Sequence, residues 1–382
     1  MRLKTKVRGS MVFILGFAAV LMVPLGIYLY ILIRRFLGLF FRNNTRLRMQ
    51  KIISLIAAAV LAAGSVNLFG LWALIVFYIA GISLLVDLIR LFARWAGCKR
   101  NRTLEWLWRS DVIAIVVTVA VLGYAYVNMH HVIVTNNTIR TEKPIREDGY
   151  RIIFLSDLHF GTTMDRAKLQ QYCRRMEEEQ PDLVVLGGDI VDEKTSLQEA
   201  GEAFQELGQI TSTYGTYYVY GNHDKGRYSK TCDFTEEQLE TVIREAGVEI
   251  LEDRSILLNE ELTITGRRDR SYAFSEGVYR KEAAELIREL PQTAYHIVAD
   301  HQPRDMEENA AAGYDLMLSG HTHAGQMWPV GLLTTLFDKK TVNYGQKSFG
   351  KMQLIVSSGI AGWGYPLRTG KHSEYVAIHI TP

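Results

Sequence analysis

The sequence predicts two unlike parts, an all-α membrane region at 1–140 and an α/β domain at 141–382. Residues 11–33, 52–86 and 112–129 carry no charged side chain. From about Thr141 onward, short β-rich apolar runs alternate with amphipathic segments instead. The whole chain is 48% hydrophobic and 22% charged, like an ordinary globular protein, because these two parts are averaged.

Four membrane spans are expected, near residues 11–33, 52–68, 70–89 and 112–129. A span needs roughly 20 apolar residues. Basic residues precede the first span, as in a signal peptide, but no small-residue cleavage site follows, so we expect an anchor. Residues 52–86 would be about 50 Å long as one helix, too long for one crossing. Gly-Ser-Val-Asn at 64–67 favours a hairpin of two spans.

Basic residues in the loops favour a multi-pass protein of the cell membrane whose C-terminal domain is extracytoplasmic. The loops after the first and third spans each hold six lysines and arginines, more than the segments on the other side. The basic N-terminus favours the opposite orientation. Asp87 is expected at the membrane interface, and the region is expected to act as an anchor because no buried acidic chain marks a transport path.

Charge and cysteine content exclude several classes of protein. The net charge of +2 gives no strong field for nucleic acid, so no nucleic-acid partner is expected. Cys98, Cys173 and Cys232 are too few for a disulfide framework or a zinc knuckle, although a single bridge between Cys173 and Cys232 remains open.

The C-terminal half alternates strands and helices, which indicates one α/β domain with helices covering sheets. The expected strands are 152–155, 183–186, 217–220, 262–265, 296–298, 316–318, 353–356 and 375–380. The expected helices are 165–179, 197–210, 236–246, 281–290 and 304–311. The third helix opens with a capping box, Thr235 and Gln238, and ends at Gly247.

Potential metal ligands follow the strand-like runs in five groups. The groups are Asp157 with His159; Asp189 in Gly-Gly-Asp; Asn222, His223 and Asp224 in Gly-Asn-His-Asp; His301; and His321 with His323 in Gly-His-Thr-His. Loops at the carboxyl ends of strands can hold side chains from distant parts of a chain around one point. Each group alone is ambiguous, but Gly188, Gly221 and Gly320 precede ligands and permit the close backbone approach that tight loops need.

The chemistry of these side chains points to a two-metal site. Carboxylate, imidazole and amide ligands without thiolate suit Mn²⁺, Fe or Zn²⁺ in open sites. Seven ligand side chains exceed the needs of one ion and match two divalent ions that share a carboxylate. Two such ions can hold a bridging water and clamp both oxygens of an in-line displacement at phosphorus. The sequence therefore predicts phosphoester hydrolysis.

The order of these motifs resembles the calcineurin-like metallophosphoesterases, from about Tyr150 to the C-terminus. Within that family the chain is most similar to the bacterial membrane-associated subgroup, because it has Gly-His-Thr-His-Ala-Gly-Gln at 320–326 and a late Ser-Ser-Gly segment that ends in Pro-x-Arg at 357–368. The resemblance implies a two-sheet β-sandwich flanked by helices.

The resemblance also implies a role for each residue. One metal is expected on Asp157, His159, Asp189 and His323, and the second on Asp189, Asn222, His301 and His321. His223 is expected to protonate the leaving oxygen, with Asp224 orienting it. Arg368 is either a surface residue or a bidentate ligand of the substrate phosphate.

The leading hypothesis is a membrane-anchored phosphodiesterase or phosphomonoesterase that uses a metal-bridging water. Its location favours a lipid or lipid-linked phosphoester. The alternatives are a non-catalytic scaffold on the same fold, which the complete ligand set disfavours, and the regulatory domain of a membrane sensor or transporter. Trp328, Trp363 and Tyr365 are expected to pack loops rather than to form an apolar lip for a lipid-like substrate.

Overall fold

The computed structural model describes residues 2–41, 44–67, 70–99, 101–229, 231–272 and 277–382. The chain divides into two compact units, Met1–Tyr124 and Ala125–Pro382, with the boundary inside the last apolar helix.

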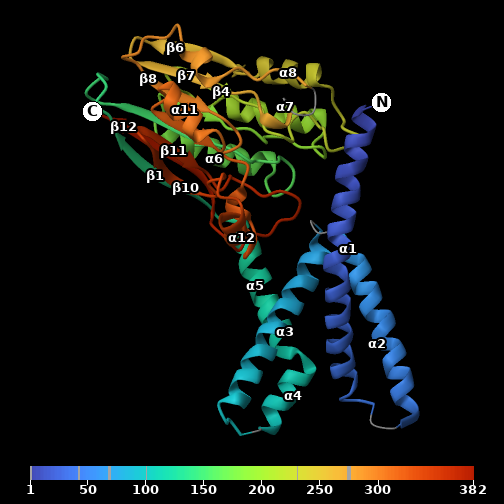
Figure 1. Ribbon diagram of the computed structural model, residues 1–382. Helices are drawn as coiled ribbons and strands as arrows, with labels where there is room; N and C mark the ends of the chain where they lie inside the picture. The colour runs from blue at the N-terminus through green and yellow to red at the C-terminus, as the bar shows by residue number, and fades with distance from the viewer. Residues whose placement is uncertain (1, 42–43, 68–69, 100, 230, 273–276) are drawn as a thin grey trace. The chain divides into compact units, whose positions relative to one another are not determined.

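The first unit is helical, as expected (Figure 1). Its elements are α1 (Arg2–Leu37), α2 (Asn44–Gly64), α3 (Leu71–Trp95), α4 (Arg102–Ser110) and most of α5 (Val112–His130). Among the described residues, four segments are long and apolar enough to cross a membrane: Val20–Leu37, Leu47–Gly64, Leu71–Trp95 and Val112–His130. Helix α4 was not expected; Asn101 caps its start by accepting the backbone N–H groups of Thr103 and Leu104.

Charged residues at the ends of the apolar segments pair with one another. Arg35 donates to Asp87 at 2.6 Å and also contacts Asp111. Tyr28 donates its hydroxyl to Asp87 at 2.8 Å. The guanidinium of Arg35 lies 4.4 Å from the Trp108 ring centroid. Asp87 therefore connects α1 to α3, a contact that the sequence pattern did not predict.

The second unit contains two six-stranded mixed sheets. The first has the order β1 (Val132–Arg140), β12 (Ser373–Thr381), β2 (Tyr150–Leu155), β3 (Leu183–Leu186), β4 (Thr216–Tyr218) and β5 (Val248–Ile250). The second has the order β10 (Gly345–Phe349), β11 (Met352–Val356), β9 (Leu316–Ser319), β8 (Tyr295–Ala299), β7 (Leu262–Gly266) and β6 (Arg254–Asn259). Strands β2 to β5 are parallel, and so are β7, β8, β9 and β11.

The two sheets share one hydrophobic core. Ile152 and Phe154 of β2 pack with Ile297 of β8 and Leu318 of β9. The alternate residues of β2, Ile153 and Leu155, face a second core instead, as the two-residue period of a strand requires. This second core includes residues of α6 (Arg166–Glu178), α7 (Leu197–Gly208) and α8 (Glu236–Glu245).

Helices also cover the other outer face. Residues of α10 (Ala283–Ile287) and α11 (Met306–Ala312) pack against β8, β9 and β11. Figure 1 shows α6, α7 and α8 together on one side of the second unit. The fold is thus the expected two-sheet sandwich flanked by helices.

Several elements differ from the sequence-based expectation. Strands β1, β5, β6 and β10 and helix α12 (Val330–Phe337) were not expected. The central residues of β10 are exposed, so it lacks the apolar alternation that predicts a strand. The helix expected at 281–290 is limited to Ala283–Ile287. All three cysteines are free, so the bridge left open between Cys173 and Cys232 does not form.

Candidate metal centre

The seven predicted ligands lie in loops that follow parallel strands. Asp157 and His159 follow β2, Asp189 follows β3, and Asn222 follows β4 in the first sheet. His301 follows β8, while His321 and His323 follow β9 in the second sheet. Carboxyl ends of parallel strands meet at one edge of a sheet, so the fold brings these loops together.

Asp157, His159 and His323 form the first candidate group, with ligand atoms within 4.8 Å of one another. The Nε2 atoms of His159 and His323 are 3.3 Å apart. His323 Nε2 is 3.4 Å from Asp157 Oδ1. All three residues are buried.

Asp189, His301 and His321 form the second candidate group. His301 Nε2 lies 3.1 Å from Asp189 Oδ2 and 3.2 Å from Asn222 Oδ1. The same Asp189 oxygen is 3.8 Å from His159 Nε2 in the first group. Asp189 therefore lies between the two groups.

The donor set fits divalent cations. His301 Nδ1 is 2.8 Å from the Gly187 carbonyl oxygen, to which it donates a hydrogen bond. With a metal ion bound, the Nε2 lone pair of a neutral His301 and the oxygens of Asp189 and Asn222 would serve as three ligands of one ion. A separate ion would bind the neighbouring nitrogens of His159 and His323.

The electrostatics of these side chains favour the ligand-competent form at His321 and Asp189 but not at Asp157 and His301. Burial raises the pKa of the Asp157 carboxyl. Burial alone would lower the pKa of His301, but the charge of Asp189 outweighs burial and raises this pKa well above its ordinary value. Burial, aided by the positive charge of His301, lowers the pKa of His321 to about 3 and so keeps its imidazole neutral. Burial opposes ionisation of Asp189, but His301 overcomes it and holds the pKa of that carboxyl well below its usual value. Neutral imidazole and ionised carboxylate are the forms that coordinate metals.

Three glycines allow these loops to come close. Gly188 has a φ of +89°, in the left-handed region. A Cβ at Gly221 would lie 2.2 Å from Asp189 Oδ1, and one at Gly320 would lie 2.3 Å from Asp157 Oδ2. Side chains at these positions would displace the ligands.

Asp224 has a different role from the one expected. Its carboxylate accepts backbone N–H groups from the loop after β3, at 2.7 Å from Asp189, 2.8 Å from Ile190 and 3.1 Å from Val191. Gly221 donates to the same carboxylate at 2.5 Å. Burial and the charge of Asp189 raise the pKa of Asp224 to about 6. Asp224 therefore fixes the loop that carries Asp189, and it does not orient the His223 ring.

Glu193 is the carboxylate at His223, and sequence reasoning missed it. Both Glu193 carboxylate oxygens lie 3.0 Å from His223 Nδ1. Burial lowers the pKa of His223, but the Glu193 hydrogen bond and the charge of Asp189 outweigh burial and raise it above its ordinary value. The available signal was the position of Glu193 four residues after Asp189.

Arg368 is not placed to bind substrate. Its side chain is completely buried. The guanidinium donates to the carbonyl oxygens of Ser358 at 2.7 Å, Ala361 at 2.6 Å and His323 at 3.2 Å. Burial lowers its pKa to about 10. The expectation of a phosphate ligand is wrong, because every contact goes to the backbone of loops that support His323.

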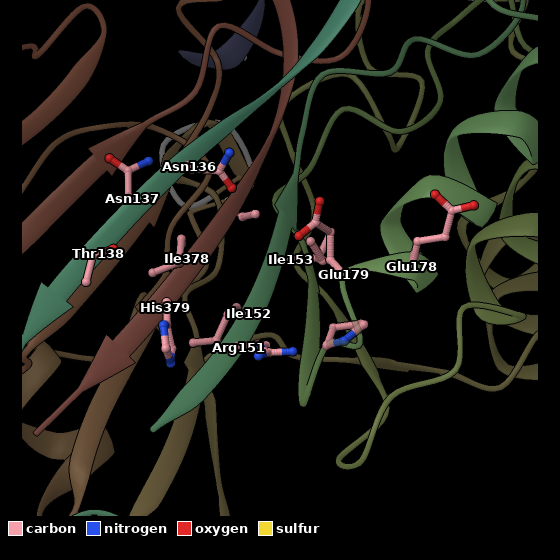
Figure 2. Close-up of a pocket in the computed structure, with 12 residues that line it drawn as sticks. Asn136, Asn137, Thr138, Arg151, Ile152, Ile153, Glu178, Glu179, Ile378 and His379 are labelled. Carbon is pink, nitrogen blue, oxygen red and sulfur yellow. The ribbon is translucent and has the colours of Figure 1, made fainter. Parts of the chain in front are cut away.

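Two cavities differ in their relation to this centre. One of about 240 Å³ is lined by His321 together with Gln302, Arg304 and residues of α12. Another of about 380 Å³ is lined by β1, β2, β12 and the end of α6 (Figure 2), including Asn136, Arg151 and Glu179, and not by the seven ligand residues. The smaller cavity is therefore the one that adjoins the metal centre.

Comparison with known proteins assigns the domain. Residues 150–325 match the calcineurin-like phosphoesterase family. An uncharacterised metallophosphoesterase of Campylobacter jejuni is 28% identical over 296 residues, covering 77% of this chain and 76% of the relative. A transmembrane protein with metallophosphoesterase domain from Danio rerio is 26% identical over 334 residues, covering 82% of this chain and 72% of the relative.

A solved structure of a Thermus thermophilus protein aligns with 55% of this chain and with 90% of its own chain, at 13% sequence identity. The TM-score of 0.36 is too low to bear on function. Residues 150–325 are thus similar to calcineurin-like phosphoesterase domains, and apolar helices precede them in the described part of the chain. Proteins similar to this chain include transmembrane ones.

Proposed function

We propose that the chain is a membrane-anchored phosphohydrolase with a dinuclear metal centre. The observation that carries this proposal is the convergence of two ligand groups, buried except for the half-buried His321, on one shared carboxylate, Asp189. The first ion is assigned to Asp157, His159, Asp189 and His323. The second is assigned to Asp189, Asn222, His301 and His321.

The ligand types suit Mn²⁺, Fe or Zn²⁺. Two bound divalent ions would supply a water of lowered pKa and neutralise charge on the phosphoryl oxygens. Asp224 keeps Asp189 in place through the backbone of its loop.

His223 supplies the proton for the leaving oxygen. Its backbone N–H donates to Asp189 Oδ1 at 2.8 Å, so the residue is held beside the shared carboxylate. Glu193 accepts from Nδ1 and leaves the Nε2–H free to protonate an alkoxide or phenoxide. Trp363 lies over the same ring, with centroids 5.5 Å apart, and restricts its orientation.

Location supports a class of substrate. Four apolar helices suit insertion in the cell membrane, and the basic residues at 34–51 and 90–109, around the connections from α1 to α2 and from α3 to α5, favour an extracytoplasmic domain. A domain held at a bilayer meets lipid and lipid-linked phosphoesters at high local concentration. We therefore favour such a substrate, cleaved as a diester or a monoester.

Hydrolysis of bis-p-nitrophenyl phosphate and p-nitrophenyl phosphate by the full chain in nanodiscs, with Mn²⁺, tests the proposal. The full chain is needed because a fragment starting at residue 141 would lack β1. We expect metal-dependent release of p-nitrophenol that is lost in Asp189→Asn and His223→Ala. Equal, negligible turnover by the folded, metal-loaded wild type and His223→Ala would instead favour a non-catalytic scaffold.

A further inference from the structure

Helix α12 displays apolar side chains that the catalytic proposal does not use. All eight residues of α12 are at least partly exposed, although five of them are Val, Leu or Phe. The exposed fractions are 51% for Leu332, 57% for Leu336 and 84% for Phe337. Trp328, just before the helix, is 64% exposed, so most of its surface does not pack against a loop. Apolar surface gathered in this way marks an interaction site.

Contacts within the second unit place this helix beside the end of α5. The backbone N–H of Trp328 donates to Thr369 Oγ1 at 2.7 Å. The preceding residue, Arg368, donates its backbone N–H to the Ala125 carbonyl at 3.0 Å. Asn128 donates to the carbonyl oxygens of Arg368 at 3.0 Å and Lys371 at 3.2 Å. The loop that contains Arg368 and Thr369 therefore forms hydrogen bonds both to the residue at the start of α12 and to the last turns of α5.

The end of α5 marks the expected membrane surface. The apolar segment Val112–His130 ends there, and Tyr126 and Val127 are 53% and 66% exposed in its last turns. Tyrosine and tryptophan are enriched where a helix leaves the bilayer. Within the second unit, α12 therefore lies near the end of a helix that is long and apolar enough to cross a membrane.

We propose that α12 and Trp328 dock on the bilayer that the chain's own helices cross. An interfacial helix buries Trp, Leu and Phe side chains about 5–10 Å into the boundary between headgroups and acyl chains. Lys339 and Lys340 follow the helix and are exposed, so they can contact lipid phosphates. A bilayer is favoured over a protein partner because α5 brings the surface to lipid without any further association.

The docked helix would also present the metal centre to lipids. Val330 and Thr334 of α12 line the cavity that contains His321. Docking would therefore place the mouth of this cavity at the level of the headgroups, where lipid phosphoesters lie. This consequence rests on the proposed hydrolysis, whereas docking itself does not.

Nitroxide accessibility in the full chain tests docking without measuring activity. A spin label is introduced by Leu336→Cys in a Cys98→Ser and Cys232→Ser background, in nanodiscs of mixed neutral and anionic phospholipid. The matched control is Leu257→Cys, an exposed leucine of β6, which lies at the opposite end of the second unit from α12 (Figure 1). Power saturation with oxygen and with a water-soluble nickel chelate compares exposure to lipid and to water.

We expect the oxygen-to-nickel accessibility ratio at Leu336 to be several-fold above that at Leu257, with an equally raised ratio in a Leu332→Cys label. Equal ratios at Leu336 and Leu257 would show that α12 lies in water and would overturn the proposal. Low accessibility to both reagents at Leu336 would show that protein covers α12, and this would overturn it too. Unchanged metal content and circular dichroism confirm that each labelled chain is folded.

Discussion

At the residue scale, the proposed acid depends on a carboxylate from a different loop. Glu193 holds His223 by its Nδ1 nitrogen, so replacement by glutamine removes a negative charge while keeping a similar shape. We expect Glu193→Gln to lower kcat for bis-p-nitrophenyl phosphate by roughly 100-fold, at the low end of general-acid contributions. Metal content should not change, because Glu193 is not among the candidate ligands.

Glu245→Gln, an exposed change on α8, provides the control. An unchanged kcat in Glu193→Gln, alongside a large loss in His223→Ala, would show that His223 does not need this partner. The dependence of kcat on pH would separate a positioning role of Glu193 from a structural one. If Glu193 acts on His223, its replacement lowers the pKa of His223, and the basic limb of the pH profile shifts to lower pH. A purely structural role would leave the position of that limb unchanged.

Arg368 gives a second prediction at this scale. Arg368→Met leaves the buried carbonyl oxygens of Ser358 and Ala361 without their Arg368 donor and removes one of the two donors to the His323 carbonyl, which should lower the free energy of unfolding by about 3 kcal/mol. The apparent Tm of the full chain should fall by roughly 6–12 °C. Arg288→Met, at an exposed site, should leave Tm nearly unchanged. A raised KM with unchanged Tm would restore Arg368 as a phosphate ligand.

The seven candidate ligands lie close together because each follows a parallel strand, and strand ends can be predicted from apolar runs. Their role as metal ligands stays a prediction. Asp224 and Arg368 were misassigned because sequence does not show where a side chain points. Glu193 was missed because its partner, His223, lies 30 residues further along the chain.

At the element scale, the loop after β9 must pass very close to the loop after β2. A methyl group at Gly320 would lie 2.3 Å from Asp157 Oδ2, so Gly320→Ala must displace a ligand of the first candidate group. We expect at least a tenfold loss of metal affinity, as for changes to supporting contacts of metal ligands. Isothermal titration calorimetry with the metal ion measures this affinity.

Gly201→Ala is the matched control, because the added methyl group on α7 meets no atom closer than 4.0 Å. It should retain metal affinity and slightly stabilise the helix. Wild-type affinity in Gly320→Ala would contradict the placement of Asp157 at the metal.

The predicted elements were the buried ones. Strands such as β3, with all four residues buried, have a continuous apolar sequence. The missed strands, β1, β5, β6 and β10, are short or lie at sheet edges, where exposed polar residues replace the apolar pattern. Residues 132–140 form a strand that pairs with β12, and their opening run Val-Ile-Val-Thr also favours a strand locally.

At the scale of the whole molecule, the chain joins four apolar helices to a domain whose two sheets close around one candidate metal centre. The number of spans and the class of domain could be predicted, because hydropathy and motif order are long-range patterns. The pairing of Arg35 with Asp87 could not, since it depends on how separate helices meet.

The most direct test of the central claim is hydrolysis measured against the number of Mn²⁺ ions bound per full-length chain. Metal-free protein in nanodiscs is titrated, and bound metal is determined by mass spectrometry at each point. If Asp189 bridges two ions, turnover of bis-p-nitrophenyl phosphate should rise with the second equivalent. His321→Ala should stop at one ion and remain inactive. Full activity at one equivalent, or none with two ions bound, would contradict the dinuclear account.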